Sequence, residues 1–255
     1  MERRAFVKGT LGAIASPSRM LDQLAKLEVL SPRVGYFLTQ HETPVFRNLG
    51  RNLIGEIAKG ALLRALPLDE NPSWGVIVPD SWVKIPHRPL AHGQAFIEMS
   101  TLSLLKNDQI EPIHPNVPPN EKTIIVHLKR PQRIEAYEYG DCQVLESKVS
   151  AGLHPGWTPK GEFRVFAKRH SRYMQGGDFD LPGVGYVQYF TGSGVALHSA
   201  YWRTEEQFGN PYSHGCVNLP LEVARWLYRW SNPVQDNMWE VEIRASGGTK
   251  IIVKD

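Results

Sequence analysis

The sequence predicts a mostly β protein with one main helix, built from two units. Short apolar or β-branched runs recur along the chain, separated by Gly, Pro, Asn and Asp, which is typical of β structure. One segment, residues 221–230, instead has apolar positions at helical spacing. A proline-rich stretch at 107–121 separates two regions of different texture. With 255 residues and 42% hydrophobic content, the chain can bury a substantial core.

The first residues resemble an export signal. Residues 3–8, R-R-A-F-V-K, are similar to the twin-arginine consensus, and a short apolar stretch and a small-residue site at 13–15 complete a candidate signal at 1–16. A plain basic arm is the alternative. Residues 17–34 predict a short amphipathic helix and linker. The sequence has no apolar run of eighteen residues, so we expect no membrane-spanning helix. The candidate export signal predicts an extracytoplasmic location, in the periplasm or cell wall.

Residues 35–106 predict a small β-barrel-like unit. Their order, with a late Gly/Trp-rich hairpin, resembles bacterial SH3-like modules, and a spacer or a lid on the second unit is the alternative. The expected strands are Tyr36–Leu38, Pro44–Phe46, Ala61–Leu63, Trp74–Val78 and Ser81–Val83.

Residues 107–121 are expected to form a stiff linker, and residues 122–255 a second, mostly β unit. Its main helix should bury Leu221, Ala224 and Leu227 against a sheet. A polar, glycine-rich segment at 171–182 predicts a loop that covers a site. The expected strands are 122–130, 133–139, 143–150, 163–167, 186–191, 239–244 and 250–253.

One histidine and a downstream cysteine cluster carry the chemical signal. They are spaced H-x14-S-H-G-C-x-N, formed by His198, Ser213, His214, Gly215 and Cys216 with the asparagine at 218. A catalytic cysteine attacks as thiolate, so it needs a nearby imidazole or a helix N-terminus. The glycine permits a sharp turn and could aim an N–H at an oxyanion. The pattern therefore predicts a thiol nucleophile with two candidate bases.

Residues after the cysteine look like a helix start. Asn218 is the expected N-cap and Pro220 lies in the first turn, so the positive end of the helix dipole would favour the Cys216 thiolate. Asn218 could alternatively contact substrate. Cys142 is the one other cysteine, and we expect it to be free in a strand, because a disulfide would silence the nucleophile.

The motif resembles that of the YkuD-type L,D-transpeptidases of bacterial cell walls, whose signature is His, a gap of about this length, then Ser/Thr-His-Gly-Cys. Residues 158–163 resemble the family's T-P-x-G-x-F stretch, and residues 189–198 resemble its approach to the catalytic histidine. The resemblance covers 121–254, and Asn218 stands where many relatives carry arginine.

The resemblance implies a β-sandwich catalytic domain and a two-step acyl transfer on peptidoglycan stem peptides, without a dissociable cofactor. Cys216 would be the nucleophile, His198 the general base, the Ser199 carbonyl the group that orients it, and the N–H groups around Gly215 the oxyanion donors. Water in place of an acceptor amine would make the enzyme an L,D-carboxypeptidase. A wall peptidase and a non-catalytic wall-binding module are the other classes.

The remaining candidates each have two interpretations. His214 binds substrate, tunes the thiol or stabilises the turn, and Ser213 contacts substrate or is a turn hydroxyl. Trp202 is core packing or an aromatic wall of the site, and Arg203 could hold a substrate carboxylate. The candidate substrate-binding residues are Trp202, Arg203, Tyr189, Ser213 and Asn218.

Other chemistries have weaker support. His198, His214 and Cys216 could ligate zinc, but the chain has no C-x-x-C pair and no H-E-x-x-H, so we expect no metal. Residues 191–195 lack the G-x-S-x-G spacing and predict a hairpin turn. The net charge of +3 is spread along the chain, which disfavours nucleic acid as a partner and suits an anionic wall polymer.

Overall fold

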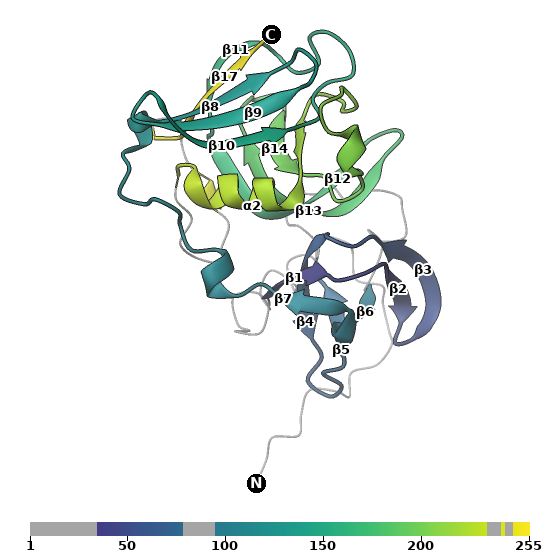
Figure 1. Cartoon of the computed structure of the whole chain (residues 1–255). Coiled ribbons are helices and arrows are strands. Elements are labelled where there is room, and N and C mark those ends of the chain that lie inside the picture. Colours follow the sequence, from purple (N-terminus) through teal and green to yellow (C-terminus); the bar gives the residue numbers. More distant parts are fainter. Residues whose placement is uncertain (1–34, 79–94, 234–240, 243–246) are drawn as a thin grey trace.

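The computed structural model describes residues 35–78, 95–233, 241–242 and 247–255. These residues form three β-sheets and one α-helix, so the prediction of a mostly β protein with one main helix is confirmed (Figure 1). The candidate export signal, the helix expected within 17–34 and the strand expected at 81–83 lie outside the described residues.

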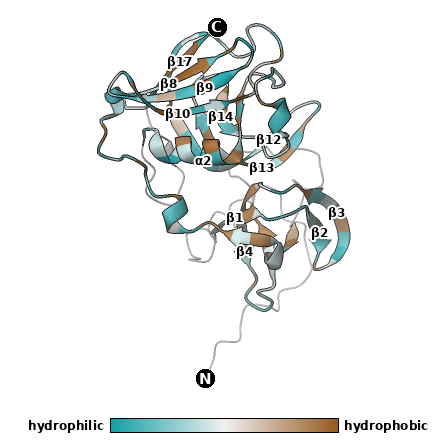
Figure 2. Ribbon diagram, in the orientation of Figure 1, coloured by the Kyte–Doolittle hydropathy of each residue, from teal (hydrophilic) through white to brown (hydrophobic). Residues whose placement is uncertain are grey.

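A seven-stranded antiparallel sheet forms the front unit. Its order is β3-β2-β6-β5-β4-β1-β7, and its small core includes Val45, Ile57, Leu63 and Ile97. Figure 2 shows hydrophobic residues on β1 and β4, which lie side by side in the sheet. The strands are β1 (Gly35–Thr39), β2 (Thr43–Asn48), β3 (Arg51–Ile57), β4 (Leu62–Pro67), β5 (Trp74–Ile77), β6 (Phe96–Glu98) and β7 (Leu102–Leu104).

The proline-rich stretch packs onto the second unit. Ile110 and Val117 are buried, and the Arg229 guanidinium donates from Nε to the Glu111 carbonyl at 2.7 Å. Short 3-10 turns at Asn107–Gln109 and Pro119–Glu121 shape the segment. Its prolines end regular structure, while its apolar residues anchor it beside the helix.

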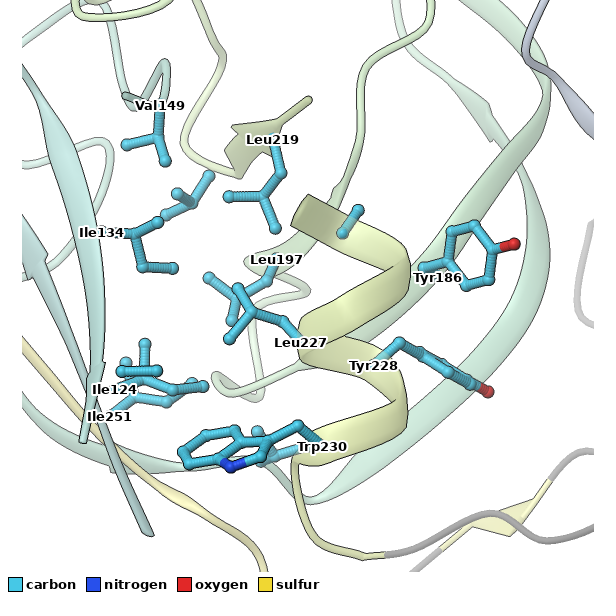
Figure 3. Packing of buried hydrophobic residues seen from close by; sticks show 14 of the residues in the cluster. Ile124, Ile134, Val149, Tyr186, Leu197, Leu219, Leu227, Tyr228, Trp230 and Ile251 are labelled. Carbon is cyan, nitrogen blue, oxygen red and sulfur yellow. The ribbon is translucent and has the colours of Figure 1, made fainter. Parts of the chain in front are cut away.

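Two five-stranded sheets enclose the main core. The first has the order β10-β9-β8-β17-β11 and the second β15-β14-β13-β12-β16. Side chains from both sheets and the helix meet in one cluster, as the β-sandwich expectation requires (Figure 3). The strands are β8 (Lys122–His127), β9 (Arg133–Glu138), β10 (Cys142–Lys148), β11 (Gly161–Arg164), β12 (Ala167–Gln175), β13 (Asp180–Tyr189), β14 (Ala196–Ser199), β15 (Val217–Leu219), β16 (Val241–Glu242) and β17 (Lys250–Lys254).

The segment expected to be a loop at 171–182 is mostly strand. β12 and β13 form a long hairpin, and only the turn at 176–179 is irregular, closed by a bond from the Gly176 N–H to the Phe179 carbonyl at 2.9 Å. The loop prediction is wrong because it treated polar residues as solvent-exposed. Ser171 is instead buried, and residues 172–174 are half-buried where β12 pairs with β13.

The helix α2 (Leu221–Trp230) ends at the buried Nζ groups of two lysines. Lys168 Nζ donates to the carbonyls of Tyr228, Ser231 (2.9 Å) and Pro233 (3.0 Å). Lys122 Nζ donates to the Trp230 carbonyl at 2.8 Å. The last carbonyls of a helix lack intrahelical partners and carry partial negative charge, so these lysines satisfy and stabilise the C-terminus of α2.

The front unit touches the second unit at the β12–β13 hairpin. Ser171 Oγ donates to the Leu62 carbonyl, and the Tyr201 ring packs against the core of the front unit. A Cβ added to Gly183, whose φ is +68°, would lie 3.0 Å from the Leu62 carbonyl oxygen. The close approach of β4 to β13 therefore needs glycine at this position.

We expect Lys168→Met to destabilise the fold, because it leaves buried carbonyls without donors. The cost should be about 2 kcal/mol, a fall in Tm of about 4–8 °C, measured by differential scanning calorimetry. Lys129→Met on the exposed surface is the matched control and should leave Tm unchanged. Equal Tm values for the two variants would contradict the capping role.

Candidate active site

Parallel pairing of β14 with β15 brings the two ends of the motif together. His198 pairs with Asn218, and Leu197 pairs with Val217. Because side chains alternate along a strand, Leu197 and Val217 face the core, and His198 and Asn218 share the opposite face. Cys216 precedes β15 and lies two residues before Asn218, so the strand direction places its side chain on the same face as His198.

The His198 ring is held in one tautomer. It is 3% exposed, and its Nδ1 lies 2.8 Å from the Ser199 carbonyl oxygen. A carbonyl can only accept, so Nδ1 carries the hydrogen and Nε2 presents a lone pair. Burial lowers the pKa of His198 to about 4, opposed by the bond to Ser199 and assisted by the charge of Arg203. The imidazole is therefore neutral at ordinary pH.

Asn218 connects His198 to Arg203. With its amide oxygen toward Arg203, it accepts from Nε at 2.7 Å and from Nη2 at 3.1 Å, and its Nδ2 donates to His198 Nε2 at 3.3 Å. The opposite orientation would set oxygen against a lone pair and nitrogen against donors, so the neighbours determine how the amide points. The N-cap prediction for Asn218 is wrong: Asn218 lies in β15, and Pro220 is the N-cap of α2.

Cys216 is a half-buried free thiol. Its Sγ donates to the Gly194 carbonyl at 3.9 Å, and its side chain packs against a small apolar cluster that includes Val187. Burial raises the pKa of the thiol, and a hydrogen bond with the backbone of Ala196 partly opposes this. The predicted help from the helix dipole is wrong, because β15 separates the cysteine from α2 and the pKa is raised. Cys142 is also free and exposed, at the start of β10.

The turn before Cys216 is tied together by hydroxyl groups. Ser213 Oγ donates to the Cys216 carbonyl and accepts from the Gly215 N–H at 3.0 Å. Gly215 has φ +134°, and an added Cβ would lie 2.7 Å from the Trp157 carbonyl oxygen, so only glycine fits. Contrary to expectation, the Gly215 N–H is directed at the serine rather than at a substrate.

Thr158 is a site residue to which the sequence argument assigned no role. Its Oγ1 donates to the Gly215 carbonyl at 2.6 Å and accepts from the Gly152 N–H at 2.9 Å. The side chain is buried and bridges two loops that border the cysteine. Its position at the head of the T-P-x-G-x-F stretch was the available signal.

His214 contacts the tip of the β12–β13 hairpin. Its ring stacks on Trp157 at 5.4 Å and lies 5.2 Å from the Phe179 ring. Its Nε2 lies 3.2 Å from Asp178 Oδ2, with both side chains largely exposed. The turn at 176–179 thus touches the catalytic motif through this histidine.

The other candidates surround the same face. The Trp202 ring lies 5.9 Å from the His198 ring, and both Trp202 and Tyr189 pack against the cluster that contains Cys216. Arg203 is half-buried, and its Nη2 donates to the Tyr212 carbonyl at 2.8 Å.

The described residues contain neither a candidate metal site nor a membrane-spanning helix. They contain no group of three or more His, Cys, Asp and Glu side chains placed to hold a metal ion. Within the same residues, no helix is long and apolar enough to cross a membrane.

Comparison with known proteins identifies the second unit. Residues 121–253 match the family model YkuD, the L,D-transpeptidase catalytic domain. The chain is 28% identical over 99 residues to probable L,D-transpeptidase 3 of Mycobacterium tuberculosis, which is 35% of this chain and 36% of that protein. It is 31% identical over 80 residues to L,D-transpeptidase 1 of the same species, 28% of this chain and 32% of that protein. The matches thus span about a third of these relatives.

Solved structures of transpeptidases are also similar. L,D-transpeptidase 3 from Mycobacterium tuberculosis, in complex with a faropenem-derived adduct, has 24% identity and a TM-score of 0.41, covering 53% of this chain and 60% of that chain. An L,D-transpeptidase from Mycobacterium smegmatis has 18% identity and a TM-score of 0.42, covering 88% of this chain and 96% of that chain.

We expect Ser199→Ala to separate stability from activity. The backbone carbonyl that holds His198 remains, so turnover should stay close to wild type. The Ser199 hydroxyl accepts from the buried Gly185 N–H at 3.0 Å, and its loss should cost about 1–3 kcal/mol in urea unfolding. Ser193→Ala, at an exposed hydroxyl, is the control. A large loss of turnover at full stability would show that the hydroxyl itself takes part in the reaction.

Proposed function

Because this chain belongs to the YkuD family of L,D-transpeptidase catalytic domains, we propose that it is a cysteine acyltransferase that cross-links peptidoglycan stem peptides through a thioester on Cys216. The observation that carries the proposal is the placement of His198 and Cys216 on one face of two parallel, adjacent strands. That placement supports proton transfer from the thiol to a base whose tautomer is already fixed.

In the first step, Cys216 Sγ attacks the carbonyl between an L-centre and a terminal D-amino acid of a tetrapeptide stem, and the thiol proton passes to His198 Nε2. The tetrahedral intermediate then collapses. The C–N bond breaks, the departing D-amino acid takes the proton from His198, and a thioester remains on the sulfur.

In the second step, an amine from a neighbouring stem attacks the thioester. Its proton passes to His198, the C–S bond breaks, and the sulfur recovers a proton as the new amide forms. Water in the place of the amine would release a tripeptide instead. The two outcomes share the same acyl-enzyme.

The resting pair in this proposal is a neutral thiol and a neutral imidazole. Burial raises the pKa of Cys216 and lowers the pKa of His198, so both shifts disfavour a thiolate–imidazolium pair. At rest the thiol donates to Gly194 and His198 Nε2 accepts from Asn218. Substrate binding would bring thiol and imidazole into contact as attack begins.

We assign the oxyanion to the Cys216 N–H, since the Gly215 N–H is bonded to Ser213. One preorganised donor contributes about 2.7–4 kcal/mol in acyl transfer. Thr158 and Ser213 would support this donor indirectly, because both hold the turn that presents it.

The hairpin tip at 176–179 is proposed as a lid over the bound stem. Its Asp178 and Phe179 reach His214, which also stacks on Trp157. A stem peptide that enters beneath the tip would exchange these contacts for its own. We assign His214 to substrate binding through the lid rather than to proton transfer.

The remaining assignments concern the whole chain. We propose that residues 122–255 form the catalytic domain, that residues 35–106 form an SH3-like unit that binds wall polymer, and that the enzyme acts outside the cytoplasm. The family's action on the cell wall supports the location. Trp202 and Tyr189, which pack beside Cys216, are proposed to border the donor peptide.

The acid limb of acylation should lie near pH 4 rather than near 6.5. His198 must be neutral to accept the thiol proton, and its lowered pKa of about 4 keeps it neutral as pH falls to that value. The measurement is kcat/KM for tetrapeptide acylation between pH 3.5 and 8, with circular dichroism to confirm that the fold persists. An acid limb near 6.5 would contradict the lowered pKa of His198.

Cys216→Ala should abolish acylation and leave the fold intact. Wild-type chain incubated with a carbapenem should gain one covalent adduct by mass spectrometry, and the variant should gain none. Incubation with a model tetrapeptide and an acceptor amine tests the reaction itself. A cross-linked product supports transfer, release of tripeptide alone indicates a hydrolase, and an unmodified wild-type thiol would exclude both. Cys142→Ala, at the exposed cysteine, is the matched control.

A further inference from the structure

We infer that Arg203 is a positioning residue that acts on His198 through Asn218, and that it does not bind the substrate carboxylate. The inference deepens the proposed function and rests on it only in part. The kinetic test requires the proposed reaction, whereas the NMR test does not. It begins from three side chains in a row, which come from the turn after β14, from β15 and from β14.

The Arg203 guanidinium is already occupied by protein acceptors. Nε and Nη2 both donate to the Asn218 amide oxygen, at 2.7 and 3.1 Å, in a two-pronged contact. Nη2 also donates to the Tyr212 carbonyl at 2.8 Å, and the guanidinium carbon lies 5.5 Å from the centre of the Tyr212 ring. The fork geometry that would hold a carboxylate is therefore used on Asn218.

This contact determines what Asn218 offers to His198. With its oxygen held by Arg203, Asn218 can present only its NH₂ group to Nε2, at 3.3 Å. A neutral imidazole accepts that hydrogen bond, but a protonated one would place its own N–H against the amide N–H. Rotating the amide would relieve this conflict only by turning the NH₂ group toward the Arg203 donors. Arg203 thus favours the neutral base.

The hydrogen bond from the Asn218 amide to His198 Nε2 is long, so it can be exchanged for one from the thiol during the reaction. At 3.3 Å it lies beyond the usual range for N–H donors, so a thiol proton can displace it at small cost. The other groups on this face are the Cys216 thiol, the Tyr189 phenol from β13 and the Trp202 ring. Arg203 is the charged neighbour that acts on His198, and its charge lowers the pKa of that ring.

A double-mutant cycle tests the inference without any reaction. The His198 ring is titrated by NMR with labelled histidine in the full chain, as wild type, Arg203→Met, Asn218→Ala and the double variant, with His198→Gln for assignment. Arg203→Met should raise the pKa of His198 by roughly one unit in the presence of Asn218, and by less than half as much in Asn218→Ala. Arg225→Met, at a half-buried arginine of α2 that pairs with Glu222, should leave the titration unchanged.

Several results would overturn the inference. Equal shifts in both backgrounds would mean that Arg203 acts by charge alone, and the absence of a shift would mean that it does not act on His198. If Arg203→Met does not fold, Arg203→Lys keeps the cation but loses the fork, and a smaller shift in the same direction is expected. Failure of both variants to fold would identify Arg203 as a structural residue instead.

Kinetics separate positioning from substrate binding. A positioning role predicts roughly tenfold lower kcat for acylation with KM unchanged, and an acid limb that moves upward together with the NMR titration. A rise in KM with kcat and the acid limb unchanged would show a substrate contact and overturn the inference. If the titration shifts as expected but no variant, nor wild type, acylates a tetrapeptide, the proposed function fails and the inference about Arg203 stands.

Discussion

The parallel register of β14 and β15 is the constraint on which the site depends. It sets His198 beside Asn218 and carries Cys216 onto the same face, while the alternate residues Leu197 and Val217 fill the core. A shift of one residue would exchange the two sets and turn His198 into the hydrophobic core of the sandwich. The short sequence between the histidine and the cysteine therefore has to return the chain to one edge of the sheet in a single register. Core packing and chemistry are thus specified by the same pairing.

Polar groups in the interior do the work that a carboxylate does in many triads. His198 is oriented by a backbone carbonyl, and Asn218 is oriented by a guanidinium. Neither partner brings negative charge to the imidazole, so the bond to the Ser199 carbonyl offsets only part of the cost of protonating a buried ring. Backbone carbonyls also serve as acceptors at the end of α2, where they bind the Nζ groups of two lysines. The sandwich accordingly buries lysine Nζ groups against neutral oxygens, and burial lowers the pKa of both lysines.

Sequence patterns predicted what depends on local chemistry. The helix at 221–230, the strands expected at 122–130 and 133–139 and the turn at 191–195 are local features, and the structure confirms them. β12 was missed because its buried lysine, arginine and histidine break the alternation that marks a strand. β14 and β15 contain only four and three residues, too few to show the alternation of a strand. Their pairing also joins residues distant in sequence, which a local pattern does not reveal. Within the site, the motif indicated the residue types, but the contacts of Thr158 with Gly215 and of Arg203 with Asn218 depend on tertiary structure.

Gly183 packs against the backbone of β4, and this close contact affects how the molecule unfolds. The front sheet and the sheet of β12 and β13 share this contact, the hydrogen bond from Ser171 to Leu62 and the packing of Tyr201 on the front core, so loosening one exposes unsatisfied groups on the other. The two units are therefore thermodynamically coupled, and denaturation should be concerted rather than modular. Any strain applied to the front sheet, for example by a tether to a rigid polymer, would be transmitted straight to the stem of the hairpin whose tip rests on His214.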